Sequence, residues 1–156
     1  GDTVLLDPGL LGRAVDLARA QNFDYVSMWT APIGAHCEVI STSALKAVRR
    51  HARADFTSEY LSWFLYDNPN FKSADLELSP AERRDWRLTL DTSEDLENIR
   101  RALALVGPKR ADYSLAELVC AVEGDKALVK KISAEPYRPN PPAGLRFDFR
   151  AARIAS

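Results

Sequence analysis

Residues Arg87–Val106, RLTLDTSEDLENIRRALALV, are the stretch that decides the fold class of this chain. Its start, Arg87–Leu90, reads as a β-strand, and Thr92 or Ser93 can cap the helix that follows. That helix has an apolar stripe at helical spacing, made by Leu96, Ile99, Leu103 and Val106. Gly107-Pro108 then ends it. A strand that turns directly into a capped helix predicts an α/β domain.

Working outward, the other strand-like segments are short and separated by turn residues. The segments that we expect to be strands are Asp24–Met28, His36–Ile40 and Leu76–Leu78. Thr3–Leu6 is a further short apolar run, and Thr30–Ala35 should be a loop because it holds Pro32 and Gly34.

Helical patterns alternate with these strands. A helix should start at Asp7-Pro8, where the carboxylate can accept backbone N–H groups and proline tolerates the first turn. Further helices are expected from a cap at Ser41–Ser43 to about Arg53, over the aromatic segment Asp55–Tyr66, and at Ser114–Glu123 and Asp125–Ser133. The alternation predicts a mainly parallel sheet with helices on both faces. We expect residues 1–107 to form the α/β domain and residues 108–156 a helical extension with a proline-rich tail.

Composition excludes some classes of partner without choosing a function. Apolar residues make up 46% of the 156-residue chain, charged residues 28%, and the formal net charge is −1. We therefore expect no nucleic acid and no membrane as partner, and a cytoplasmic protein in which Cys37 and Cys120 are free thiols. His36 and His51 have no ligand-spaced partners and are interpreted as structural, and the arginines of the tail as solvated.

Two aspartates could carry chemistry. Asp91 directly follows the predicted strand Arg87–Leu90, and ligands of parallel sheets bind beyond the carboxyl ends of the strands. Asp2 stands beside another apolar run, and two such carboxylates could share Mg²⁺ with substrate phosphates. The alternatives are that Asp91 merely caps the following helix and that Asp2 is an ordinary terminal residue.

Several segments, in register from residue 1 to about 106, resemble the cytidylyltransferase superfamily. The family signature R-W/L-T-V-D-T-P-E-D-L resembles Arg87–Leu96, and the T-G-D-x-P-L-I-D-P segment resembles the opening Gly1–Pro8. The family's D-Y-V-S and P-x-G-x-x-x-E-V-F-S segments resemble Asp24–Ser27 and Pro32–Ser41. The family segment R-E-H-V-T and a following N-P resemble Arg53–Thr57 and Asn68-Pro69. The sugar-activating members, the spore coat polysaccharide biosynthesis protein F family above all, are the most similar.

The resemblance implies a nucleotide-diphospho-sugar transferase-like fold and a reaction. A sugar or sugar-acid hydroxyl would attack the α-phosphate of CTP, giving a CMP-sugar and pyrophosphate, with Asp2 and Asp91 holding Mg²⁺ (or Mn²⁺). Glu38 and Arg53 fall where the family faces its sugar pocket or dimer partner, the alternative being an ordinary structural ion pair.

The sequence also departs from the family pattern. Ala54-Asp55 replaces the E-H of R-E-H-V-T, and the family prolines after Asp2 and Thr92 are Val4 and Ser93 here. The family's N-terminal nucleotide-binding half has no counterpart in these residues, so we expect the chain alone to bind CTP poorly and to pair with that half or with a second copy. Three hypotheses about its function stay open. The chain is part of a CMP-sugar synthetase, a non-catalytic interaction or regulatory module in a polysaccharide pathway, or a related domain that binds another nucleotide.

Overall fold

The computed structural model describes residues 3–51, 61–107 and 112–136, and within these ranges helices alternate with short strands. The helices are α1 (Pro8–Gln21), α2 (Thr42–His51), α3 (Ser93–Val106), α4 (Leu115–Glu123) and α5 (Lys126–Ile132), with a 3-10 turn η1 at Leu61–Phe64. The strands are β1 (Tyr25–Ser27), β2 (Val39–Ile40) and β3 (Ser73–Asp75). The α/β class predicted from the sequence is confirmed.

The sheet has three strands in the order β2-β1-β3, with β1 in the middle. β1 pairs antiparallel with β2 and parallel with β3, so the sheet of the described residues is mixed rather than mainly parallel. Tyr25 lies opposite Ile40 on one side and Ser73 on the other. This register places the residues that follow Ser27 and Asp75 at the same edge of the sheet.

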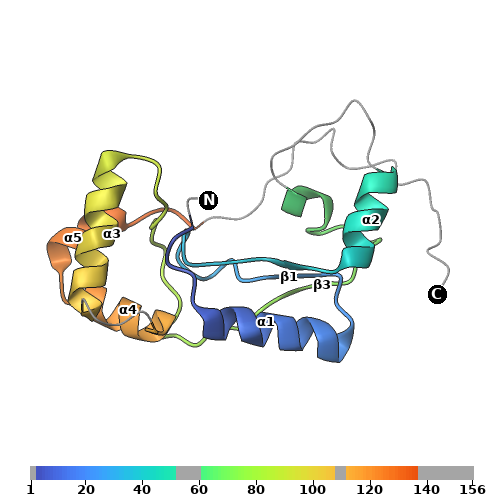
Figure 1. Cartoon of the computed structure of the whole chain (residues 1–156), viewed down its shortest axis with the longest axis horizontal. Helices are drawn as coiled ribbons and strands as arrows, with labels where there is room; N and C mark the ends of the chain where they lie inside the picture. Colours follow the sequence, from blue (N-terminus) through green and yellow to red (C-terminus); the bar gives the residue numbers. More distant parts are fainter. Residues whose placement is uncertain (1–2, 52–60, 108–111, 137–156) are drawn as a thin grey trace.

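Both faces of the sheet are covered, as predicted. Val26 points into the main core, which includes Leu10 and Ala14 of α1. Its neighbour Tyr25 points the opposite way, into a second cluster with residues of α2 and η1. Figure 1 shows α1 running along the sheet, with α2 near one of its ends and α3, α4 and α5 grouped beyond the other.

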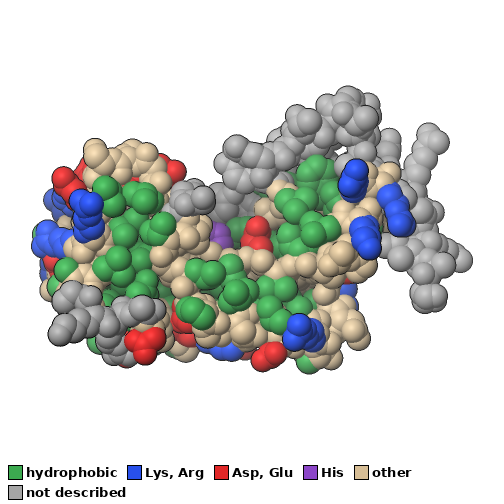
Figure 2. Space-filling model, in the orientation of Figure 1, with side chains coloured by type: hydrophobic (Ala, Val, Ile, Leu, Met, Phe, Trp, Pro, Cys, Tyr) green, Lys and Arg blue, Asp and Glu red, His purple; other side chains and the backbone are tan. Residues whose placement is uncertain are grey.

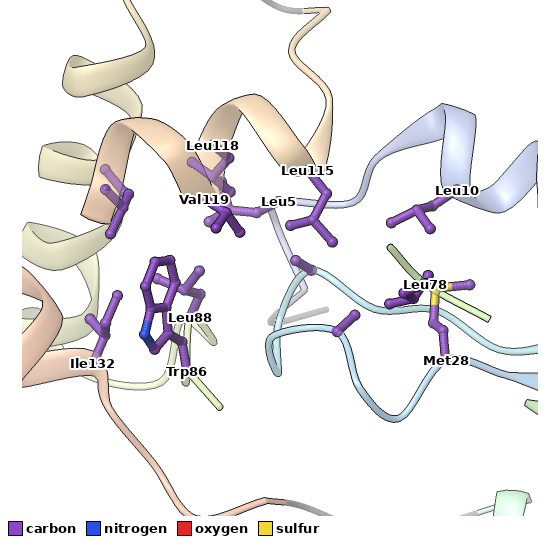
Figure 3. Packing of buried hydrophobic residues seen from close by; sticks show 14 of the residues in the cluster. Leu5, Leu10, Met28, Leu78, Trp86, Leu88, Leu115, Leu118, Val119 and Ile132 are labelled. Atoms are coloured by element: carbon purple, nitrogen blue, oxygen red, sulfur yellow. The ribbon is translucent and has the colours of Figure 1, made fainter. Parts of the chain in front are cut away.

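The helices α4 and α5 pack into the main core. Leu118 and Val119 of α4 lie over Trp86 and Leu88, and Leu115 lies beside Leu5, as Figure 3 shows. Of the stripe predicted on α3, Ile99 is buried, and Leu103 and Val106 pack against the core half-buried. Residues 112–136 therefore share one hydrophobic core with the α/β elements.

Helix boundaries follow the predicted caps. Asp7 accepts hydrogen bonds from Gly9 and Leu10 at the start of α1, and Ser114 forms a capping box with Glu117 at the start of α4. Gly107 ends α3 with a positive φ of 117°. The end of α2 near Arg53 and the first part of Asp55–Tyr66 lie outside the described residues.

Three strand predictions need correction. The segment Arg87–Leu90 forms no continuous strand. Arg87 makes one isolated parallel bridge to Ile33, and the residue before it, Trp86, makes one isolated antiparallel bridge to Ser133. The segment Leu76–Leu78 is not a strand: Leu76 and Leu78 are buried, but the strand β3 is Ser73–Asp75. Of His36–Ile40, only Val39–Ile40 pairs. Alternating hydrophobicity shows which side chains are buried but not which residues pair. The strands β2 and β3 pair only as far as the central strand β1 extends, and β1 ends because the chain turns after Met28 (Ala31 N–H to Met28 O, 3.0 Å).

No helix among the residues that the structure describes is long and apolar enough to cross a membrane.

Candidate functional site

The turn before α3 is built by its own sequence. Thr92 is the N-cap: its hydroxyl accepts the Asp95 N–H, and Asp95 Oδ2 accepts the N–H groups of Asp91 (3.1 Å) and Thr92 (2.9 Å). The Thr92 hydroxyl bond in the first place, with these N–H groups and Arg87, holds the pKa of Asp95 below its ordinary value. Asp91 is therefore not the cap, and its side chain is left for other contacts.

The Asp91 carboxylate is half exposed and is held through one oxygen. Its Oδ2 accepts hydrogen bonds from the Arg87 guanidinium and from Thr89 Oγ1, the latter at 2.9 Å. Arg87 also bonds Asp95 Oδ1 at 3.0 Å, so one guanidinium links both aspartates. Among the described residues no hydrogen bond reaches Asp91 Oδ1, and 47% of the side chain is exposed. That oxygen can therefore take a ligand from solvent.

A close backbone contact fixes the segment that carries Asp91. Gly34 has φ +94°, and a Cβ there would lie 2.3 Å from the Leu88 carbonyl oxygen. Directly before Gly34, Ile33 makes two backbone hydrogen bonds to the same segment: its N–H donates to Trp86 O (2.8 Å), and its carbonyl accepts from Leu88 N–H (2.7 Å). Leu5 N–H reaches Gly34 O at 3.3 Å, so the extended start of the chain lies against the same loop. The glycine of the P-x-G segment is thus required by packing.

Glu38 lies at the other end of this loop, just before β2. Its Oε1 accepts a hydrogen bond from the Tyr25 hydroxyl, and no hydrogen bond within the described ranges reaches Oε2. Burial in the first place, and Glu38 as both acceptor and charge, raise the pKa of Tyr25 far above its ordinary value, so this phenol stays protonated. Burial and Glu38 likewise raise the pKa of the Cys37 thiol.

A second carboxylate is held in a similar way on the other side of β1. Asp75 Oδ1 accepts hydrogen bonds from Ser27 Oγ and from Trp29 N–H, both at 3.0 Å. The Trp29 ring lies 5.8 Å from the His36 ring and meets Tyr66 edge-on at 6.0 Å, measured between centroids. Figure 2 shows a histidine and an acidic side chain in a hollow of the face on view, between the helical end and an apolar patch.

Of the four predicted site residues, the structure describes two, Asp91 and Glu38. Asp2 and Arg53 lie outside the described residues, so the predicted pairing of Asp2 with Asp91 stays a prediction. Asp91 and Glu38 belong to the two segments that Gly34 holds together. The described residues contain no group of three or more His, Cys, Asp or Glu side chains that could hold a metal ion.

Sequence reasoning missed the side chains that hold these carboxylates. Arg87 lies four residues before Asp91, and Thr89 lies two residues before it, so their spacing in RLTLD could have indicated the contacts. Tyr25 is 13 residues from Glu38 and is brought to it only by the pairing of β1 with β2.

Two known proteins are similar to this chain in sequence. The chain is 30% identical over 122 residues to the spore coat polysaccharide biosynthesis protein SpsF of Bacillus subtilis, a match that covers 76% of this chain and 50% of SpsF. It is 34% identical over 97 residues to the uncharacterized protein MJ1063 of Methanocaldococcus jannaschii, covering 61% of this chain and 40% of that protein. No protein-family model matches the chain.

The fold is also similar to a solved structure, a cytidylyltransferase from Leptospira borgpetersenii, with a TM-score of 0.72 and 21% identity. That match covers 88% of this chain and 58% of the other. The chain is thus similar in sequence to SpsF, and it shares the fold of a cytidylyltransferase. It spans about half the length of the curated relatives that it matches, 50% of SpsF and 40% of MJ1063.

Proposed function

We propose that this SpsF-like chain is part of a nucleotidyltransferase that activates a sugar or sugar acid by transferring CMP from CTP, for the synthesis of a surface or spore coat polysaccharide. The observation that carries the proposal is the turn before α3. It leaves one oxygen of Asp91 open to solvent and fixes the other by Arg87 and Thr89. Similarity to a spore coat polysaccharide biosynthesis protein supports the same pathway class.

In this proposal Asp91 would hold Mg²⁺ (or Mn²⁺) together with the CTP phosphates, and Asp2 would supply a second carboxylate. The donor set suits a hard cation, because Mg²⁺ takes oxygen ligands and often uses one or two carboxylates plus phosphate oxygens. When bound, the cation would neutralise charge that develops on the triphosphate. Arg87 would keep the carboxylate in one orientation through its bond to Oδ2.

The acceptor sugar would lie on the side of Glu38, with Arg53 as its second contact. Its hydroxyl would attack the α-phosphate of CTP: the new P–O bond forms while the bond from the α-phosphorus to the bridging oxygen breaks, pyrophosphate leaves, and the hydroxyl proton passes to water. The work of these residues is positioning and charge stabilisation rather than covalent catalysis. The part of an SpsF-like protein that this match does not cover, or a second copy of the chain, would complete the site.

The test is formation of a CMP-sugar by the polypeptide that contains residues 1–156, measured as pyrophosphate release at increasing Mg²⁺. Asp91→Asn should lower turnover at limiting Mg²⁺ by at least about tenfold, and it should weaken Mn²⁺ binding followed by electron paramagnetic resonance. Glu97→Gln is the matched control, since it removes an exposed carboxylate from α3 outside the turn.

Wild-type metal dependence and Mn²⁺ affinity in Asp91→Asn would refute the metal assignment. If the wild-type protein formed no CMP-sugar from CTP yet bound another protein of a polysaccharide pathway, the non-catalytic reading would replace this proposal.

A further inference from the structure

Tyr25 occupies an unusual place in the sheet, because its ring is buried while its hydroxyl reaches a charged side chain. It lies in the central strand β1, is 1% exposed, and packs in the second cluster with Phe64 and Phe71. The hydroxyl, at the end of the ring, donates a hydrogen bond to Glu38 Oε1.

The strand register explains how the contact arises. β1 pairs with β2 so that Val26 lies opposite Val39, and continuing this register places Glu38 opposite Ser27. On the other side Ser27 lies opposite Asp75. Glu38, Ser27 and Asp75 thus form one row across the three strands, and side chains in such a row point to the same face. Tyr25, two residues before Ser27, points to that face too.

Packing alone does not account for the hydroxyl. The neighbouring aromatic positions of the cluster, Phe64 and Phe71, fill their space without one. A buried hydroxyl needs a hydrogen-bond partner to offset its loss of water, and this partner is the half-exposed Glu38. The bond occupies Oε1 only, so it orients the carboxylate while Oε2 stays open, within the described residues, to a ligand.

We infer that Tyr25 is a positioning residue that holds Glu38 in the orientation in which it binds the acceptor sugar; the inference rests on the proposed function. A long glutamate side chain otherwise samples several rotamers, and a fixed carboxylate binds a sugar hydroxyl with less loss of freedom. The rigid ring of Tyr25, locked in the core, supplies that restraint.

The test compares Tyr25→Phe, Glu38→Gln and the double variant in steady-state kinetics of the full polypeptide. CTP and the best acceptor from a panel of hexoses and sugar acids are varied separately. Tyr25→Phe should raise the KM for the acceptor several-fold and leave the KM for CTP unchanged. The double variant should be no worse than Glu38→Gln, because Tyr25 acts through Glu38. Tyr66→Phe, which removes another phenol hydroxyl next to the same cluster, should leave both KM values unchanged.

Two results would overturn the inference while the proposed function stands. One is a wild-type KM for the acceptor in Tyr25→Phe; the other is an increase in this KM in the double variant that equals the product of the increases in Tyr25→Phe and Glu38→Gln. Equal increases in both KM values, with a lowered unfolding midpoint, would show a merely structural role and also overturn it. Absence of CMP-sugar formation by the wild-type protein refutes the proposed function and this inference together.

Discussion

Asp7 connects two helix starts that are far apart in the sequence, and its removal should destabilise the protein more than the loss of an ordinary cap. Its Oδ1 accepts the N–H groups of Gly9 (2.7 Å) and Leu10 (3.3 Å) at the start of α1. Its Oδ2 accepts the N–H of Leu115, the first residue of α4, at 2.8 Å. Asp7 is 7% exposed and Leu115 only 1%, so water cannot readily replace the second bond.

The expected loss can be estimated from these contacts. Removing an N-cap side chain costs about 1 kcal/mol, and losing a hydrogen bond to a charged acceptor costs about 1.5–3 kcal/mol. Asp7→Ala should therefore lower the free energy of unfolding by about 3 kcal/mol in total, which is a large part of the ~5–15 kcal/mol of a typical domain. Asp7→Asn should fall between the two proteins, because its amide can accept at one helix start only and presents N–H groups to the other.

Urea denaturation followed by tryptophan fluorescence measures this loss. With an m-value of about 2 kcal/mol/M, the midpoint of Asp7→Ala should fall by about 1.5 M. Ser114→Ala is the control: it removes a single cap, the acceptor of the Glu117 N–H at 3.3 Å, and should cost about 1 kcal/mol. Hydrogen exchange at the Leu115 amide should speed up in Asp7→Ala. If Asp7→Ala lost no more stability than Ser114→Ala, or left exchange at Leu115 unchanged, the link between α1 and α4 would carry no energy and the reasoning would be wrong.

Two further predictions concern backbone and pH. Gly34→Ala should lower the free energy of unfolding by about 3 kcal/mol, because the backbone has φ +94° and the new Cβ would meet the Leu88 carbonyl at 2.3 Å. Gly12→Ala, in α1 with nothing within 4 Å of the added Cβ, should instead stabilise by about 0.5–1 kcal/mol; thermal unfolding of both variants would expose an error if they shifted alike. Burial alone would raise the pKa of Glu82, but hydrogen bonds from Ser79 and Arg13 outweigh it and leave the pKa below the ordinary 4.5. A lowered pKa in the folded state means that Glu82 stabilises the protein fully above about pH 4.5 and progressively less as pH falls below it. Glu82→Gln should therefore lose stability at pH 7 and show a flatter acid limb in urea titrations; an unaltered limb would rule out this contribution.

The sequence by itself determined where α1, α3 and α4 begin and which side chains cap them. The capping boxes that start α3 and α4 each join two residues only three positions apart, Thr92 with Asp95 and Ser114 with Glu117. Such contacts lie within one helical turn and can be predicted from the local sequence. The same holds for the carboxylate of Asp7 over Gly9 and Leu10. The α/β class followed from these starts and from the alternation of apolar segments, and the family resemblance followed from motifs in register.

The tertiary structure decided the strand boundaries and the side chains that hold the candidate site. Strand pairing depends on a partner far along the chain, which is why the strand is Ser73–Asp75, opposite β1, and ends before the apolar residues Leu76 and Leu78. Tyr25 meets Glu38 only through the register of β1 on β2. Gly34 meets Leu88 across 54 residues, and Asp7 meets Leu115 across 108. Contacts over such separations arise from how the whole core packs, and no local pattern encodes them.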